Sequence, residues 1–289
     1  MRTAVIGVIG GSGLYQMDAL RDPRELRVDT PFGVPSDVIV TGQVDGIPVA
    51  FLARHGRGHR LLPSEVPYRA NLYALKQLGI EYLLSFSAVG SLREELRPLD
   101  MVLPDQFIDL TRRRESTFFG QGVVAHVSMA QPVCPNVADA LARAASGLRE
   151  PVRVHRGGTY VCIEGPQFST QAESQWYRSM GASVIGMTNM PEAKLAREAQ
   201  IAYATLAMVT DYDCWHPREA AVTADVAMAN LLKNAQNAQR IAAAAIRIIG
   251  AERPASIAHT ALASGLVTQS PDISAELHTR LAAILPTRV

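Results

Sequence analysis

Short apolar segments alternate with helical patterns along most of the chain, and this alternation constrains the fold more than any other feature. The segments are rich in Val, Ile and Leu, and most lack the two-residue period of a half-exposed strand, as expected for strands buried on both faces. Strands that alternate with helices predict an α/β fold. We expect a single domain with a central mixed β-sheet flanked by helices. The expected strands lie at 4–9, 37–41, 47–53, 82–88, 159–163, 182–187 and 201–210, and the expected helices at 68–79, 135–148, 171–181, 191–199 and 224–249.

The last of these helices is Ala-rich, contains no Gly or Pro, and is expected to close the main domain, which we assign to residues 1–250. A break that contains Pro254 follows. Residues 251–289 are polar and Ala-rich with a weak apolar face. We expect them to form a C-terminal helical extension that packs on the domain or on a neighbouring subunit.

The composition limits the classes of partner. The formal net charge is +1, and no run of five like charges occurs, so neither nucleic acid nor an anionic membrane is expected to bind. The three cysteines are widely spaced and include no C-x-x-C pair, which favours neither a disulfide framework nor a zinc site. The N-terminal apolar run is only about eight residues long, too short for a membrane span or a cleaved signal. We expect a cytoplasmic protein that binds a small molecule.

The glycine-rich segment VIGVIGGSGLY at 5–15 follows an expected strand. It contains no G-x-G-x-x-G, which argues against a nicotinamide-dependent oxidoreductase, and it misses G-x-S-x-G by one residue. Its backbone N–H groups and the Ser12 hydroxyl either hold an anion or form a plain tight turn.

Two more expected strands end on polar residues. LARHGRGHR at 52–60 presents Arg54 and His55, which suit a phosphate or form a solvated basic loop, and its glycines argue against a helical His pair on a metal. SFSAVGS at 85–91 presents a hydroxyl and small residues. Ligands of α/β sheets collect outside the carboxyl ends of the strands. Taken together, these segments predict one anion site that contains Ser12, Arg54, His55, Ser87 and Ala88.

Three later segments leave two interpretations open. Phe168 in CIEGPQFSTQAES and Met187 in VIGMTNMPEA are either core residues or ligand contacts. Asp211 and Asp213 bracket a tyrosine where the strand AMVTDYDCW ends. These two carboxylates either contact a ligand or reach solvent.

The segments GGSGLY, ARHGRGHR, SAVGS, EGPQFST, MTNMPEA and TDYDCW, in this order, resemble the purine nucleoside phosphorylase superfamily and, within it, the methylthioadenosine phosphorylase branch. The resemblance covers roughly residues 3–250. It implies phosphorolysis of an N-glycosidic bond: 5′-methylthioadenosine and phosphate would give adenine and 5-methylthioribose 1-phosphate. Inorganic phosphate would be a co-substrate, and no metal or organic cofactor is implied.

The resemblance also assigns roles by position. Met187 would lie beneath the ribose and Phe168 against the purine. Asp211 would donate a proton or a strong hydrogen bond to purine N7 and accept one from the 6-amino group, while Asp213 would support that contact. The implied phosphate ligands are Ser12, Arg54, His55, Ser87, the backbone of Ala88, and Thr188.

Two positions bear on the choice of base. Members that act on 6-oxopurines resemble one another in carrying Asn where this chain has Asp211 and Glu where it has Ser169. Both differences favour adenine, because a buried polar mismatch discriminates strongly. A phosphorylase of broader or 6-oxopurine specificity, acting on methylthioinosine or inosine, is the alternative. A nucleoside-binding protein without activity is a further alternative, which the intact phosphate residues disfavour.

The resemblance extends to the 5′ end of the substrate and to the assembly. Ala224 and Ala227 match positions that face the 5′-methylthio group. His126 matches a residue that a neighbouring subunit contributes to this pocket, which implies a homotrimer or a dimer of trimers. The chain departs from the family at Pro67, where an Asn is common, so that a side-chain amide and a backbone donor are lost from the phosphate loop.

Overall fold

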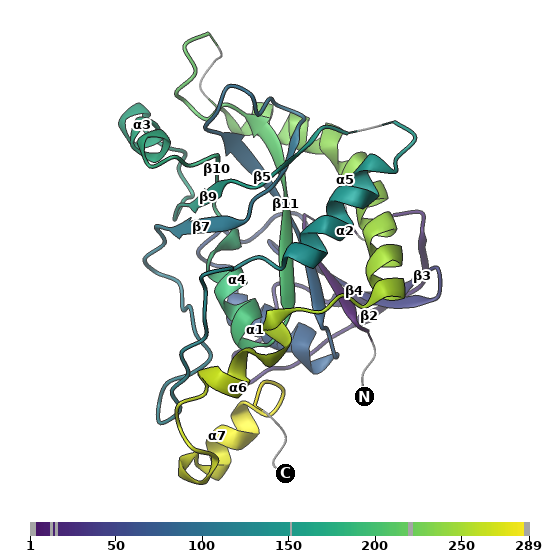
Figure 1. Cartoon of the computed structure of the whole chain (residues 1–289), viewed down its shortest axis with the longest axis vertical. Coiled ribbons are helices and arrows are strands. Elements are labelled where there is room, and N and C mark those ends of the chain that lie inside the picture. The colour runs from purple at the N-terminus through teal and green to yellow at the C-terminus, as the bar shows by residue number, and fades with distance from the viewer. Residues whose placement is uncertain (1–3, 12–13, 15–16, 151, 219–221, 286–289) are drawn as a thin grey trace.

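The computed structural model describes residues 4–11, 14, 17–150, 152–218 and 222–285. Within these residues eleven strands form one mixed sheet, and helices cover both of its faces (Figure 1). The predicted α/β fold is therefore confirmed.

Parallel strands form the centre of the sheet. β5 pairs in parallel with β1 on one side and with β11 on the other, and β1 pairs in parallel with β4. Every residue of β1 and β11 is buried, which explains why these strands are continuous apolar runs. Because the four strands are parallel, their carboxyl ends meet at one edge of the sheet. They are β1 (Ile6–Gly10), β4 (Ile47–Ala53), β5 (Tyr82–Ser91) and β11 (Ala202–Asp211).

The flanking strands complete the sheet in the order β2-β3-β4-β1-β5-β10-β9-β7, with β11 joining β5 to β6 and β6 pairing with β8. The sequence prediction omitted β2, β6, β7 and β8. In β2 only Leu20 is buried and Pro23 lies inside it, as an edge strand allows. The other three have only three or four residues. The bounds are β2 (Leu20–Leu26), β3 (Ile39–Val44), β6 (Met101–Leu103), β7 (Gln106–Asp109), β8 (Val154–Arg156), β9 (Thr159–Cys162) and β10 (Val184–Gly186).

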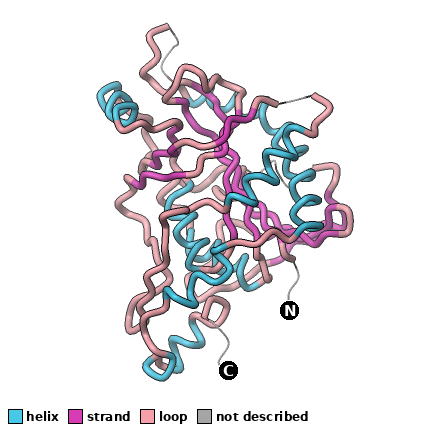
Figure 2. Tube along the Cα trace, in the orientation of Figure 1, coloured by secondary structure: helices cyan, strands magenta, loops and turns pink. Residues whose placement is uncertain are grey.

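The helices form two layers, which Figure 2 shows on either side of the strands. α2 and α5 pack together and share one apolar cluster with the sheet, whereas α1 and α4 share a second one. α3 begins with a capping box between Thr170 and Glu173 and lies near the β9–β10 edge (Figure 1). The helices are α1 (Tyr68–Gln77), α2 (Pro135–Ser146), α3 (Gln171–Ser179), α4 (Asn189–Glu198) and α5 (Ala224–Glu252).

After α5 the chain crosses to the layer of α1 and α4. Leu262, Ile273 and Leu281 are buried in the same apolar cluster as residues of these helices. The elements of this segment are η2 (Ile257–Thr260), α6 (Ala261–Gly265), η3 (Ser270–Asp272) and α7 (Ala275–Arg280). None of the helices in the described ranges combines the length and hydropathy that a membrane span requires.

Ala242 tests how tightly α5 packs on the sheet. It is fully buried, whereas Ala251 on the same helix is exposed. We expect Ala242→Leu to lower the free energy of unfolding by about 1–3 kcal/mol, because a core at crystal-like density cannot take the added volume. Ala251→Leu should stay within about 0.5 kcal/mol of the parent. Urea unfolding measures both, and equal effects would show that the interface is loosely packed.

Candidate active site

The carboxyl ends of the central strands bring the predicted residues together. Gly10 pairs with Ala53, which precedes Arg54, and Asp211 pairs with Gly90 at the end of β5. Ala88 is exposed although its neighbours Ser87 and Val89 are buried, so a ligand at this edge can reach it. The predicted anion site and the two aspartates therefore share one edge of the sheet. Ser12 lies outside the described residues.

Arg54 is almost completely buried and is held by protein groups. Its Nε and Nη2 donate to the two carboxylate oxygens of Glu192 at 2.6 and 2.9 Å. Nη2 also donates to Ser85 Oγ at 2.7 Å, and Nη1 donates to the carbonyl of Phe86 at 3.0 Å. Burial by itself lowers the pKa of Arg54, but the adjacent Glu192 outweighs this and raises it above its ordinary value. Arg54 is therefore a fixed, charge-neutralised group, and these bonds leave over one of its five N–H donors, on Nη1.

The Glu192 carboxylate connects Arg54 to the other phosphate candidates. It accepts hydrogen bonds from Ser85 Oγ at 2.8 Å and from the Tyr203 hydroxyl at 2.9 Å. Asn189 donates to Ser85 Oγ at 3.2 Å and accepts from Ser87 Oγ at 3.1 Å. One network thus fixes the orientation of both Arg54 and the predicted ligand Ser87.

His55 is half-buried next to Arg54, and its ring stacks on His59 with centroids 4.2 Å apart. Burial and the Arg54 charge lower the pKa of His55 to about 4, although its bond to a backbone carbonyl opposes this. The ring is therefore neutral at pH 7. Because Nδ1 lies 2.9 Å from the Leu61 carbonyl, Nδ1 carries the proton and Nε2 is an acceptor. His55 can accept a hydrogen bond from a protonated phosphate oxygen or a ribose hydroxyl.

The nucleoside candidates lie on the neighbouring segments. Thr188 is buried and precedes α4. Met187 packs against Gly165, where an added β-carbon would lie 2.5 Å from Met187 Sδ and where φ is +66°. Only glycine meets both conditions, so the turn that leads to Phe168 is pressed against Met187. The Phe168 ring is 44% exposed, as a surface that a purine covers would be.

Asp211 and Asp213 are both buried, with exposed fractions of 8% and 4%. Asp211 Oδ1 accepts from the Asp213 backbone N–H at 2.8 Å, and Oδ2 accepts from Thr210 Oγ1 at 2.6 Å. A β-carbon at Gly90 would lie 2.9 Å from Asp211 Oδ1, so glycine permits this approach. Burial raises the pKa of Asp211 to about 6 and also raises the pKa of Asp213. Asp211 is thus a carboxyl that can hold and donate a proton near neutral pH.

The start of α5 is tied to this end of β11. Asn230 Nδ2 donates to the Thr210 carbonyl at 2.7 Å, and the Val222 N–H donates to the Asp213 carbonyl at 2.8 Å. Ala227, one turn before Asn230, is half-buried, and Ala224 is exposed. His126 is also exposed, and its backbone N–H donates to the Gly265 carbonyl at 2.7 Å. His126 lies in the loop between β7 and α2, which carries none of the other predicted site residues.

Several residues that hold the site were missed by sequence reasoning. Asn189 and Glu192 lie inside the segment MTNMPEA, but Glu192 reads there as an ordinary first-turn acid of a helix. Arg114 lies in TRRRES, which reads as a solvated basic run. Only the strand-end pattern marks ligand residues in a single sequence, and the side chains behind them carry no such signal.

No cluster of three or more His, Cys, Asp or Glu side chains suited to a metal occurs in the parts of the chain that the structure describes.

Known proteins share this architecture. The family model of the phosphorylase superfamily matches residues 5–247. The chain belongs to this superfamily. Proteins named S-methyl-5′-thioadenosine phosphorylase are similar to it: that of Thermosynechococcus vestitus is 58% identical, with 98% of each chain covered, and that of Gloeobacter violaceus is 59% identical, with 98% of this chain and 95% of the relative covered. The resemblance inferred from the motifs is confirmed, and the protein is a pentosyltransferase enzyme.

Two solved structures extend the comparison. A methylthioadenosine phosphorylase from an antarctic soil metagenomic library superposes with a TM-score of 0.95 at 64% identity, covering 99% of this chain and 100% of the other. The methylthioadenosine phosphorylase of Schistosoma mansoni in complex with adenine superposes with a TM-score of 0.81 at 40% identity, covering 86% and 93% of the two chains.

Glu192→Gln tests the buried ion pair. The substitution removes one charge and leaves Arg54 buried without its counter-ion, so we expect a loss of about 3–5 kcal/mol in the free energy of unfolding. The exposed pair of Arg143 and Glu252, with Nη2 and Oε2 2.6 Å apart, provides the control. Glu252→Gln should leave the urea midpoint unchanged. Similar shifts for both variants would argue against a structural role of the Glu192 charge.

Asp211→Asn tests the protonation state of the site. Because burial raises the folded-state pKa of Asp211 from its ordinary 3.8 to about 6, its stabilising contribution is full below about pH 4 and is lost as the pH rises through about 6. Above that pH the ionised form costs about 3 kcal/mol. Asn should therefore raise the melting temperature at pH 8 relative to the parent, and should not do so at pH 4. The exposed Asp29→Asn should show the same difference from the parent at both pH values, and a pH-independent effect at 211 would contradict the raised pKa.

Proposed function

We propose that the protein catalyses phosphorolysis of 5′-methylthioadenosine to adenine and 5-methylthioribose 1-phosphate, a reaction that returns the purine and the sugar to salvage. The C1′–N9 bond breaks, its electron pair moves to the purine, and a phosphate oxygen forms the new bond to C1′. The purine leaves after N7 gains a proton. The names of the relatives and the arrangement of the site support this proposal.

The observation that carries the proposal is a protonatable carboxyl at the end of β11, beside strand ends that carry anion-binding groups. In the proposed reaction, Arg54, His55, Ser87, the Ala88 backbone, Thr188 and Ser12 hold phosphate. Asp211 donates its proton to N7 as charge develops on the departing base. A carboxyl whose pKa is near 6 retains enough acidity to donate and enough affinity to be protonated near neutral pH.

For the nucleoside, we propose contacts from Met187 to the ribose and from Phe168 and Ser169 to the purine. Asp213 supports the base contact, because it is buried beside Asp211 and its backbone N–H donates to Asp211 Oδ1 at 2.8 Å. The ionised Asp211 carboxylate left after proton transfer accepts from the 6-amino group of adenine. Adenine is favoured over 6-oxopurines, because Ser169 supplies no carboxylate to accept an N1–H.

The 5′-methylthio group would contact Ala224 and Ala227, whose small apolar side chains leave room for sulfur and a methyl. We propose that His126 of a neighbouring copy closes this pocket in a homotrimer or a dimer of trimers. In support, His126 is exposed and its segment pairs with the C-terminal region, where Val267 is 54% exposed. Phosphate supplies the nucleophile and Asp211 the proton, so the proposed reaction needs no cofactor. We also propose a cytoplasmic location, in keeping with three unpaired cysteines.

Product analysis tests the function directly. Purified protein would be given methylthioadenosine, adenosine, methylthioinosine and inosine, each with and without inorganic phosphate. We expect phosphate-dependent adenine release, fastest from methylthioadenosine. Phosphate-independent release would make the protein a hydrolase, and hypoxanthine as the preferred product would overturn the assignment of base specificity.

Asp211→Ala should lower kcat by about 10²–10⁴ with a smaller change in KM.

A further inference from the structure

Arg114 lies behind the proposed site and binds several of its segments at once. Its side chain is 1% exposed. Nη1 donates to the carbonyls of Met187 and Met190 at 2.6 Å each and to the Tyr68 hydroxyl at 3.1 Å. Nη2 donates to the Glu164 carbonyl at 2.8 Å. The planar, five-donor guanidinium is the side chain that can bind so many acceptors in fixed directions.

Glu164 is the counter-ion of Arg114 and collects further contacts. Its Oε1 lies 3.2 Å from Arg114 Nε and accepts a hydrogen bond from the Ser64 hydroxyl. Its Oε2 accepts from the backbone N–H groups of Arg112 and Arg113 at 2.5 and 3.1 Å. Burial by itself raises the pKa of Glu164, but the hydrogen bonds from Ser64 and from the two backbone groups hold it at about 2. The carboxylate is therefore charged at every pH of interest.

These contacts join the two halves of the site. On the phosphate side, Ser64 binds Glu164 directly, while Tyr68 donates to the Pro63 carbonyl at 3.0 Å and accepts from Arg114. Both contacts anchor the segment that follows His55, whose ring is itself fixed by Leu61. On the nucleoside side, Arg114 holds the backbone of Met187, and Glu164 begins the turn that leads to Phe168.

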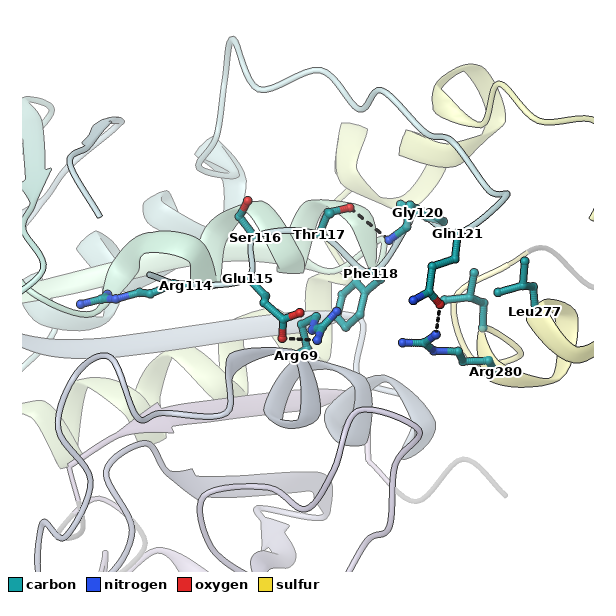
Figure 3. A pocket seen from close by; sticks show the side chains of 12 residues that line it. Arg69, Arg114, Glu115, Ser116, Thr117, Phe118, Gly120, Gln121, Leu277 and Arg280 are labelled. Carbon is teal, nitrogen blue, oxygen red and sulfur yellow. Dashed lines mark hydrogen bonds and ion pairs between the residues drawn. The ribbon is translucent and has the colours of Figure 1, made fainter. Parts of the chain in front are cut away.

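Arg114 is one of the residues that line a neighbouring cavity, but the hydrogen bonds of its guanidinium go to the segments of the site. A cavity of about 400 Å³ lies between residues 114–121, Arg69 of α1, and α7. Figure 3 shows Arg69 and Glu115 facing each other there, whereas Arg114 points away from the other labelled residues. Arg69 is thus a neighbouring arginine with an ion pair of its own outside the site.

We propose that Arg114 and Glu164 are positioning residues that couple phosphate binding to nucleoside binding. Phosphate orders the segment 55–67, and Ser64 and Tyr68 transmit that order through Arg114 and Glu164 to Met187 and to the Phe168 turn. The bound nucleoside is then held with C1′ toward the phosphate. This coupling rests on the proposed function, because it concerns the same two substrates.

The test measures the dissociation constant of a nucleoside analogue with and without saturating phosphate. The analogue has a carbon–carbon glycosidic bond and so cannot react. We expect phosphate to tighten its binding to the parent protein by about tenfold, within the usual range of coupling between sites. Ser64→Ala removes the hydroxyl that binds Glu164, and Arg114→Lys removes the planar guanidinium. In both variants the tightening should fall to less than about twofold. Binding of the analogue alone to Ser64→Ala should change little, because Ser64 lies on the phosphate side.

Matched variants separate coupling from general damage. Ser64→Thr keeps the hydroxyl and should restore the tightening. Arg69→Lys makes the same chemical change as Arg114→Lys on the residue next to Tyr68 and should leave the tightening as in the parent. Ser64→Ala is a small change at a half-buried position, so it gives an answer even where Arg114→Lys lowers stability.

The outcomes for the coupling and for the proposed function are distinct. An unreduced tightening in Ser64→Ala and Arg114→Lys would overturn the coupling, as would a parent protein that binds the analogue equally with and without phosphate. Either result is compatible with phosphate-dependent release of adenine by the parent. If the parent protein shows no phosphate-dependent release of adenine, the proposed function itself is overturned.

Discussion

The buried ion pair between Arg54 and Glu192 is the interaction on which the site depends. The two side chains are 2% and 0% exposed, and removal of two charges from water costs several kcal/mol per ion. The structure offsets this with a two-point contact and with further bonds from Ser85, Tyr203 and the Phe86 carbonyl. These groups come from β5 and β11, and Arg54 and Glu192 themselves from the end of β4 and from α4. The same pair therefore fixes the relative positions of four elements whose ends form the site.

This arrangement limits the uncompensated charge that is buried in the site. Glu192 neutralises Arg54, burial lowers the pKa of His55, and burial raises the pKa of Asp211. The charges of Arg54 and Glu192 thus compensate each other, while His55 and Asp211 are shifted toward their neutral forms. Phosphate would bring negative charge to donors that are already oriented, and the proton on Asp211 is available where the leaving base gains charge. Catalytic acidity and stability oppose each other at Asp211, because the burial that keeps the proton also penalises the ionised carboxylate.

The buried strands and some of the residues at their ends can be predicted from the sequence, whereas the edge strand and the residues behind the site cannot. β1 and β11 are buried on both faces and therefore appear as apolar runs, whereas β2 exposes all residues but Leu20 and follows no pattern. Its place at a strand end predicted Arg54 as part of an anion site, whereas the strand end left the role of Asp211 open and the resemblance to the family assigned it. Glu192 and Arg114 could not be predicted, because their partners are carbonyls and side chains distant in sequence, which no local period reports.

Pro67 shows how the chain tolerates a change in its phosphate loop. It occupies the N-cap of α1, and its carbonyl accepts from the Asn71 N–H at 2.9 Å. A residue at this end of a helix has no intrahelical acceptor for an N–H, so proline loses little there. The side-chain amide that is common in the family is absent. Nearby, however, Tyr68 accepts a hydrogen bond from Arg114, and Ser64 donates one to Glu164. The loop is therefore held through residues on either side of Pro67, by contacts to Arg114 and Glu164, which also hold the nucleoside side of the site.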